Sequence, residues 1–138
     1  MPRPYRILVV DDEPSNSLLL KTMLESFGHE TEVAHDGDEA LGKLTPHLDL
    51  IVSDIMMPEI NGYELCRRIR ADPGFRDLPV IMVTVLGDRD DRLRAAEAGA
   101  NDFITKPVNK LDLQLRVASL LRMKEEQDAI KRHKRTQD

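Results

Sequence analysis

The sequence predicts an α/β domain built on a doubly wound, five-stranded parallel sheet. Two short apolar runs, residues 7–10 and 80–83, are typical of strands that are buried on both faces. A third run, residues 48–52, has the same character apart from Asp49. Helical patterns separate these runs, and such alternation produces right-handed crossovers with helices on both faces of the sheet.

The first two helices can be placed from the residues at their ends. Pro14 suits the first turn of one helix, and Gly28 suits the position just after its end. We expect the second helix to begin after Asp36, which can act as its N-cap. The apolar stripe expected to face the core from the first helix is Leu18, Leu19, Met23, Leu24 and Phe27.

Three further helices and two weaker strands complete five βα units. The third helix covers residues 62–70, the fourth ends near Gly99, and the last starts at Asn109 and runs past Met123. Residues 30–34 and 102–105 are more polar than the other strands, which suits the edges of a sheet. The side chains expected to point inward from the third helix are Leu65, Cys66 and Ile69.

The composition favours one intracellular domain with a short extension. The 138 residues include 20 basic and 25 acidic side chains, so we expect no direct nucleic-acid binding. A single cysteine, the lack of a signal peptide and the lack of a membrane-spanning run predict a cytoplasmic protein that does not bind membranes. We expect residues 1–123 to form the domain and residues 124–138 to form a polar helical extension or linker.

Five polar side chains follow or end the predicted strands. Asp11 and Asp12 follow the first, Asp54 follows the third, Thr84 ends the fourth and Lys106 follows the fifth. In the strand order 2-1-3-4-5 the first and third strands are neighbours, so the three carboxylates meet at the carboxyl edge of the sheet. A hard divalent cation with oxygen ligands relieves their repulsion, which predicts Mg²⁺.

This arrangement predicts that Asp54 is a phosphoryl acceptor. An aspartate has an ordinary pKa of about 3.9 and is already ionised at neutral pH, so this nucleophile needs no general base. The cation would reduce the repulsion between Asp54 and an anionic donor, while Thr84 and Lys106 would hold the transferred oxygens.

The chain resembles the receiver domain of bacterial two-component response regulators over residues 5–123. The shared motifs are, in chain order, residues 7–13, residues 54–58 followed by Gly62, then Thr84, and Lys106-Pro107. The resemblance implies a flavodoxin-like fold and a phosphorylation-dependent signalling switch. The implied partner is a sensor histidine kinase or a histidine phosphotransfer protein.

The resemblance also implies roles for individual residues around the metal. Asp54 would be phosphorylated, and Asp12, Asp54 and the backbone carbonyl of Met56 would bind Mg²⁺. Asp11 would support the metal through water. The domain would catalyse only its own phosphorylation and dephosphorylation, so it is not expected to be an enzyme with an external substrate.

A second group of implied residues concerns the switch. Thr84 and Lys106 would contact the phosphoryl group, and Phe103 would rotate as Thr84 moves toward it. The peptide bond between Lys106 and Pro107 would be cis. The face made by the fourth helix, fifth strand and fifth helix would then bind a partner or a second copy of the chain.

Two other functions remain open from the residues. In a haloacid-dehalogenase-like phosphatase Asp11 would be the nucleophile, although Asp11 and Glu13 only loosely match the Asp-x-Asp pattern of that class. In a degenerate receiver Val85, where the family usually has a small residue, would restrict access to the site. The apolar Met56 and Leu86 offer no side chain to orient water, which predicts a slowly hydrolysing phospho-aspartate.

Overall fold

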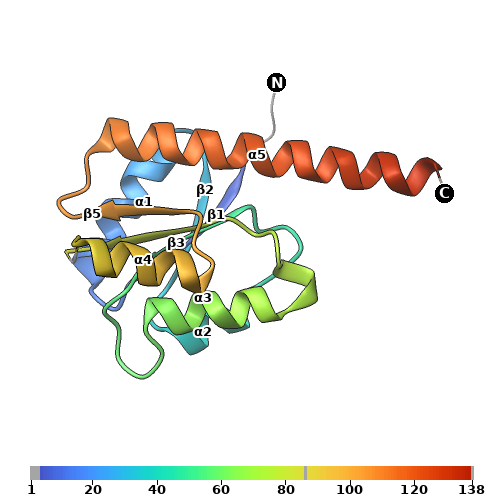
Figure 1. The fold of residues 1–138 in the computed structure, drawn as a ribbon. Helices are drawn as coiled ribbons and strands as arrows, with labels where there is room; N and C mark the ends of the chain where they lie inside the picture. Colours follow the sequence, from blue (N-terminus) through green and yellow to red (C-terminus); the bar gives the residue numbers. More distant parts are fainter. Residues whose placement is uncertain (1–3, 86, 138) are drawn as a thin grey trace.

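The computed structural model describes residues 4–85 and 87–137, which form a five-stranded sheet with helices on both faces (Figure 1). All strand pairs are parallel and the order is β2-β1-β3-β4-β5, as predicted. The strands are β1 (Arg6–Val10), β2 (Glu30–Ala34), β3 (Leu50–Asp54), β4 (Val80–Thr84) and β5 (Asp102–Thr105).

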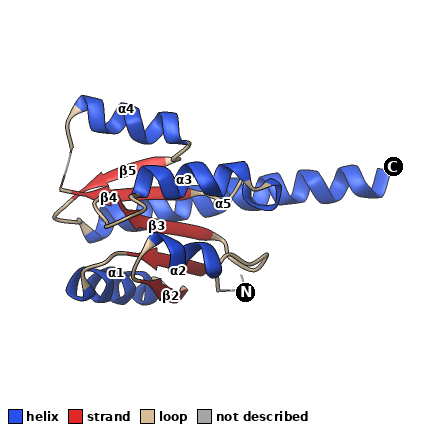
Figure 2. Cartoon of the chain, turned by 90° about the horizontal axis from the view of Figure 1, so that it is seen from below, coloured by secondary structure: helices blue, strands red, loops and turns tan. Residues whose placement is uncertain are grey.

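Two helices cover one face of the sheet and three cover the other (Figures 1 and 2). The first pair is α1 (Pro14–Ser26) and α5 (Lys110–Gln137), and the other three are α2 (Gly37–Gly42), α3 (Gly62–Ala71) and α4 (Arg89–Ala98). A short 3-10 helix, η1 (Pro73–Phe75), follows α3. The two layers of helices enclose two separate apolar clusters, one on each side of the strands.

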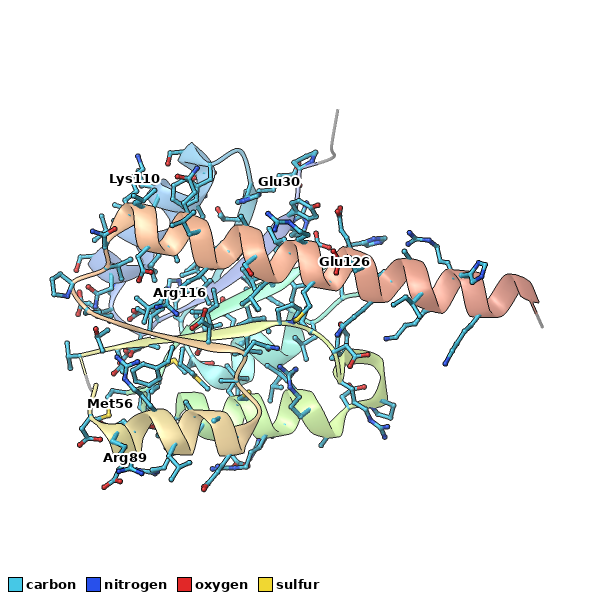
Figure 3. All side chains as sticks on the ribbon, turned by 45° about the horizontal axis from the view of Figure 1, so that its top comes forward. Glu30, Met56, Arg89, Lys110, Arg116 and Glu126 are labelled. Atoms are coloured by element: carbon cyan, nitrogen blue, oxygen red, sulfur yellow. The ribbon has the colours of Figure 1, made fainter. Side chains whose placement is uncertain are left out.

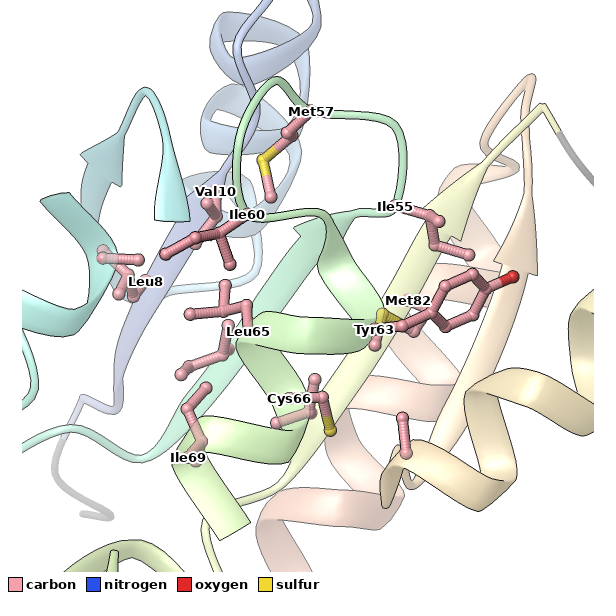
Figure 4. Packing of buried hydrophobic residues seen from close by; sticks show 14 of the residues in the cluster. Leu8, Val10, Ile55, Met57, Ile60, Tyr63, Leu65, Cys66, Ile69 and Met82 are labelled. Atoms are coloured by element: carbon pink, nitrogen blue, oxygen red, sulfur yellow. The ribbon is translucent and has the colours of Figure 1, made fainter. Parts of the chain in front are cut away.

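The strands supply both clusters because successive side chains point to opposite faces. Ile7 belongs to the cluster beneath α1 and α5, whereas its neighbour Leu8 belongs to the cluster beneath α2, α3 and α4. The cluster beneath α2, α3 and α4 includes Leu65, Cys66 and Ile69, which α3 buries as predicted (Figure 4). Burial raises the pKa of the Cys66 thiol, which suits its role as a small core residue.

The inward stripe of α1 differs from the predicted one. Leu18 and Leu19 are 62% and 52% exposed, and α1 buries Leu20 in their place. The rest of the prediction is confirmed, since Leu24 is buried and Met23 and Phe27 pack partly buried against the same cluster. Because residues 18–20 are all leucine, the sequence does not show which of them faces the sheet, and packing on the sheet selects Leu20. The end of the helix was predicted correctly, since Gly28 follows it with a φ of 94°.

Two other helix ends agree with their sequence signals. Asp36 is the N-cap of α2, and its Oδ1 accepts the N–H of Glu39 at 2.7 Å. Gly99 closes α4 in the left-handed region, with a φ of 102°. These local interactions set where the two helices begin and end, whatever packs against them.

Helix α5 begins after Asn109, whose side chain accepts the N–H of Asp112, and continues to residue 137 (Figure 1). Beyond its apolar part it contacts the amino end of the sheet through charged groups. Lys124 Nζ lies 3.6 Å from Asp49 Oδ1, and Lys131 pairs with Asp77. The extension is therefore helical, and the domain boundary at residue 123 stays a prediction. Among the described residues no helix is long and apolar enough to cross a membrane.

One histidine, His29, is not fully exposed. The ring of half-buried His29 lies edge-on to Tyr5, with 5.7 Å between ring centroids. Tyr5 precedes β1 and His29 precedes β2, so the pairing of these neighbouring strands brings the rings together. Burial lowers the pKa of His29, and the charge of Asp49 opposes that effect. The exposed histidines are His35, His47 and His133.

Candidate functional site

The carboxyl ends of β1 and β3 bring three carboxylates together. Asp11 directly follows β1 and Asp54 is the last residue of β3, and these strands pair with Val10 opposite Ser53. One ligand atom from each of Asp11, Asp12 and Asp54 lies within 4.8 Å of the other two. Asp11 is fully buried, Asp54 is 7% exposed and Asp12 is exposed. The cluster is thus open to solvent on the side of Asp12.

Lys106 provides a positive charge to this cluster from the end of β5. Its Nζ lies 3.4 Å from Asp11 Oδ2 and 3.4 Å from Asp54 Oδ2. Its backbone N–H donates to the carbonyl of Thr84 at 2.8 Å, and the Lys106-Pro107 peptide is cis, as the sequence predicted. One ammonium group does not balance three ionised carboxylates.

The pKa of Asp54 is raised above its ordinary value. Burial is the largest influence and raises the pKa, and the charge of Asp11 raises it further. Lys106 opposes both, as do the N–H groups of Ile55 and Met56, which donate to Asp54 Oδ1 at 2.7 and 3.4 Å. The backbone after β3 therefore orients the carboxylate and holds one of its oxygens.

The donor set fits a hard divalent cation. Carboxylate oxygens from three residues surround one point, and such oxygen ligands suit Mg²⁺ better than a metal that prefers nitrogen or sulfur. Met56 follows in the loop after β3, at the end of the molecule where α5 begins with Lys110 (Figure 3). The predicted roles of the Met56 carbonyl and of the water next to Asp11 stay predictions.

The other predicted site residues lie on β4 and β5. Thr84 is the fully buried last residue of β4, a strand that pairs with β3 on one side and β5 on the other. It is therefore at the same carboxyl edge as Asp54. Phe103 lies earlier in β5, opposite Met82, and is 7% exposed. The structure brings Thr84, Lys106 and the three carboxylates to the carboxyl edge of the sheet. Phe103 lies two residues before the end of β5 and is not at that edge.

The sequence placed Gly62 at the start of a helix and in a shared motif, but it did not reveal how closely this residue approaches the backbone of the site. A Cβ at this position would lie 2.4 Å from the backbone oxygen of Asp54 and 2.8 Å from Ile55 Cα. Its N–H donates to the carbonyl of Ile55 at 2.9 Å, so the start of α3 packs directly on the backbone at the site. The preceding Asn61, which caps α3, marks a helix start but not this close approach.

A hollow of about 360 Å³ adjoins Lys106. Val85, which was expected to restrict access to the site, is 73% exposed and forms part of the wall. Leu86 lies outside the described residues, so its predicted role stays a prediction. The lining residues are Asn16, Leu19, Leu20, Val85, Lys106, Pro107 and Val108.

Comparison with known proteins agrees with this geometry. The sequence model of a family described as "Response regulator receiver domain" matches residues 7–118. A probable transcriptional regulator, ycf27 of Cyanophora paradoxa, is 44% identical over 87% of this chain and 49% of its own length. The response regulator PleD of Caulobacter vibrioides is 43% identical over 86% of this chain and 26% of its own length. The chain thus spans half or less of these relatives.

Solved structures share the fold over nearly their whole length. A putative response regulator from Chloroflexus aurantiacus has a TM-score of 0.82 at 37% identity, covering 86% of this chain and 98% of the other. The receiver domain of sensor histidine kinase PA1611 from Pseudomonas aeruginosa has a TM-score of 0.79 at 30% identity, covering 86% and 98%. That structure has a magnesium ion coordinated in its active-site cleft.

Proposed function

The chain belongs to the response regulator receiver domain family, and on that premise we propose that it is a switch controlled by phosphorylation of Asp54. The donor would be a sensor histidine kinase or a histidine phosphotransfer protein. The observation that carries the proposal is the cluster of Asp11, Asp12 and Asp54 with the ammonium group of Lys106 at 3.4 Å.

The chemistry is transfer of one phosphoryl group. The Asp54 carboxylate attacks phosphorus, the bond from phosphorus to the donor nitrogen breaks, and its electron pair returns to the donor imidazole. Lys106 and the Thr84 hydroxyl bind phosphoryl oxygens on which negative charge is spread. Mg²⁺, when bound by Asp12, Asp54 and the Met56 carbonyl and supported by Asp11 through water, would supply positive charge that lets two anions approach. The reaction modifies the chain itself and turns over no external substrate.

The output would be a change in a binding face. Thr84 and Phe103 would transmit the charge at Asp54 to the surface made by α4, β5 and α5. Leu93 on α4 and Leu115 on α5 are exposed apolar side chains on these elements, which suits association with a partner or a second copy. Sedimentation with and without acetyl phosphate tests the second copy. A monomer under both conditions would contradict the homodimer.

Intact mass spectrometry after treatment with acetyl phosphate and MgCl₂ tests the proposal directly. We expect the chain to gain the mass of one phosphoryl group and Asp54→Asn to gain none. Glu97→Gln, which removes an exposed carboxylate on α4, should be labelled like the original chain. An unlabelled original chain would instead support a degenerate receiver that acts only as an interaction module.

The phosphatase alternative is not favoured by the position of Asp11. Its side chain is fully buried, its Oδ1 accepts the N–H of Glu13 at 2.9 Å, and its Oδ2 lies beside Lys106. Asp54 makes similar contacts but is 7% exposed, so a substrate can reach Asp54 more readily than Asp11. Loss of labelling in Asp11→Asn with retention in Asp54→Asn would nevertheless identify Asp11 as the nucleophile.

We also propose that the protein is cytoplasmic.

A separate proposal concerns the lifetime of the phospho-aspartate, which we expect to hydrolyse slowly. Met56 is exposed and apolar, so its side chain cannot position an attacking water near Asp54. The sequence has a second apolar residue, Leu86, two positions after Thr84. The decay of the labelled mass after removal of acetyl phosphate measures the lifetime. A half-life of a few seconds in the purified protein would contradict slow hydrolysis.

A further inference from the structure

Met56 is the most exposed of the methionine side chains that the structure describes. It is 59% exposed, whereas Met57 is 8% exposed and Met82 is fully buried. Met23 and Met123 are half-buried. An oxidant in solution has to reach the sulfur atom, so exposure decides which thioether reacts first. Met56 is therefore the methionine that a peroxide would oxidise most readily.

The backbone of the loop after β3 keeps Met56 next to the proposed phosphoryl acceptor. The N–H of Met56 donates to Asp54 Oδ1 at 3.4 Å, and Asp54 Oδ2 lies 3.4 Å from Lys106 Nζ. The side chain of Met56 is at the end of the molecule where α5 begins (Figure 3). Methionine is unbranched and has three rotatable bonds, so a group attached to its sulfur can approach a phosphoryl group on Asp54.

The neighbouring Met57 fixes the loop without help from the side chain of Met56. The N–H groups of Met57 and Gly62 both donate to the carbonyl of Ile55, at 3.1 and 2.9 Å. The Met57 side chain packs with Ile60 in the apolar cluster beneath α2, α3 and α4 (Figure 4). An oxygen added to Met57 would place a polar group in this core, whereas an oxygen added to Met56 would remain in solvent. Oxidation of Met56 therefore leaves the packing of the loop intact.

Oxidation would change the property of Met56 on which slow hydrolysis depends. Hydrogen peroxide transfers one oxygen atom to Sδ, so that an S–O bond forms, the O–O bond breaks and water leaves. The sulfur is oxidised by two electrons and the peroxide is reduced by two. The resulting sulfoxide is polar and accepts hydrogen bonds, unlike the apolar thioether. Such an acceptor can hold a water molecule in position to attack the phosphorus of phosphorylated Asp54.

We propose that Met56 is a site of reversible oxidation by peroxides, and that its sulfoxide shortens the lifetime of the phospho-aspartate at Asp54. The inference rests on the proposed function, because it assumes that Asp54 accepts a phosphoryl group and that the unoxidised chain loses it slowly. Methionine sulfoxide reductases return the sulfoxide to the thioether. Peroxide would thus be a second input to the switch, which ends the phosphorylated state sooner.

Limited treatment with hydrogen peroxide, followed by peptide mass spectrometry, tests the site of oxidation. We expect Met56 to gain one oxygen atom before Met57 and Met82 do. Oxidation of Met57 or Met82 ahead of Met56 would overturn the inference.

The decay of the labelled mass after removal of acetyl phosphate tests the effect on lifetime. We expect the oxidised chain to lose its phosphoryl group about two- to tenfold faster than the original chain, the factor that one net hydrogen bond provides. Methionine sulfoxide reductase, applied before labelling, should restore the original decay. Equal decay of the oxidised and original chains would overturn the inference.

Three variants assign the effect to the sulfur of Met56. Met56→Leu has no sulfur at this position, so peroxide should leave its decay unchanged. Met123→Leu removes a half-buried methionine from α5 and should respond to peroxide as the original chain does. Met56→Gln carries a carbonyl oxygen on an unbranched side chain and should decay faster than Met56→Leu without any peroxide. Acceleration by peroxide that persists in Met56→Leu, or equal decay of Met56→Gln and Met56→Leu, would overturn the inference.

Two further measurements separate this inference from its premises. The shift in Tm caused by MgCl₂ should be the same before and after oxidation, and loss of that shift would overturn an effect on water in favour of one on the metal. The original chain and Asp54→Asn are labelled in parallel. If the original chain is not labelled, the proposed function fails and the effect on lifetime fails with it. Labelling that depends on Asp54 but decays equally with and without oxidation removes only this inference.

Discussion

Lys106 Nζ and Asp54 Oδ2 lie 3.4 Å apart although 52 positions separate the two residues in the chain. Asp11 Oδ2 is at the same distance from the same ammonium group. Lys106 therefore compensates two buried carboxylates before any phosphoryl group arrives, and it is positioned to bind an anion that becomes attached to Asp54.

Lys106→Met should lower the rate of labelling by acetyl phosphate on the order of 100-fold, the usual effect of removing one charge-stabilising group from a reaction site. Lys110→Met removes an exposed charge at the start of α5 and should leave the rate unchanged. Mass spectrometry over time measures both. Similar rates in Lys106→Met and the original chain would show that the ammonium group does not bind the transferred oxygens.

Asp54→Asn should stabilise the protein at neutral pH in the absence of divalent cations. The pKa of Asp54 is raised in the folded state above its ordinary value, mainly by burial, so its protonated form favours folding. That contribution is fully present below the unfolded pKa and is lost as pH rises through the folded pKa. The gain in Tm from Asp54→Asn should consequently shrink as pH falls toward 4. A gain that does not change with pH would contradict this explanation.

Mg²⁺ should stabilise the folded chain, because a bound cation relieves repulsion among Asp11, Asp12 and Asp54. At free Mg²⁺ tenfold above Kd the gain is about 1.4 kcal/mol, or roughly 4–6 °C in Tm. Thermal unfolding with MgCl₂ and with EDTA measures it. Asp12→Asn, which removes the exposed ligand of the cluster, should need more Mg²⁺ for the same shift. Equal shifts in both chains would exclude Asp12 as a ligand.

Gly62→Ala should destabilise the protein by about 1–3 kcal/mol, the typical cost of overpacking. Its new methyl group would meet the backbone of Asp54 and Ile55, which cannot move as a flexible side chain can. Gly42→Ala is the control, because a Cβ there has nothing within 4 Å. We expect that change to be neutral or to stabilise by about 0.5–1 kcal/mol in urea unfolding. Equal effects of the two substitutions would argue against the close approach.

Lys124→Met should cost about 1–3 kcal/mol, since it removes the charge beside the buried carboxylate of Asp49. Lys131→Met removes an exposed pair with Asp77 on the same helix and should have a much smaller effect. Urea unfolding compares the two variants. A larger loss from Lys131→Met would show that the outer contact, not the inner one, holds the extension of α5.

Local patterns in the sequence were enough for the architecture and for the main site residues. Apolar runs mark buried strands, and the placement of functional groups at the carboxyl ends of parallel strands brings Asp54 near Asp11 and Asp12. Helix ends such as those at Asp36 and Gly99 depend on a residue and its immediate neighbours. These features are predictable because the physical interaction that causes each of them lies within a few residues or follows from strand order.

Other features depend on packing between distant segments. Asp49 interrupts an apolar run for no reason visible in the sequence, yet its carboxylate accepts the N–H of Arg6 at 2.9 Å and lies beside Lys124. The buried phase of α1 and the approach of Gly62 to Asp54 are of the same kind. The sequence by itself determined the strands, the helices and the doubly wound class, because short-range periodicity causes them, and the strand order expected of that class placed the acidic cluster at one edge. Only the tertiary structure decided these contacts, because each depends on which side chains from remote parts of the chain occupy the same space.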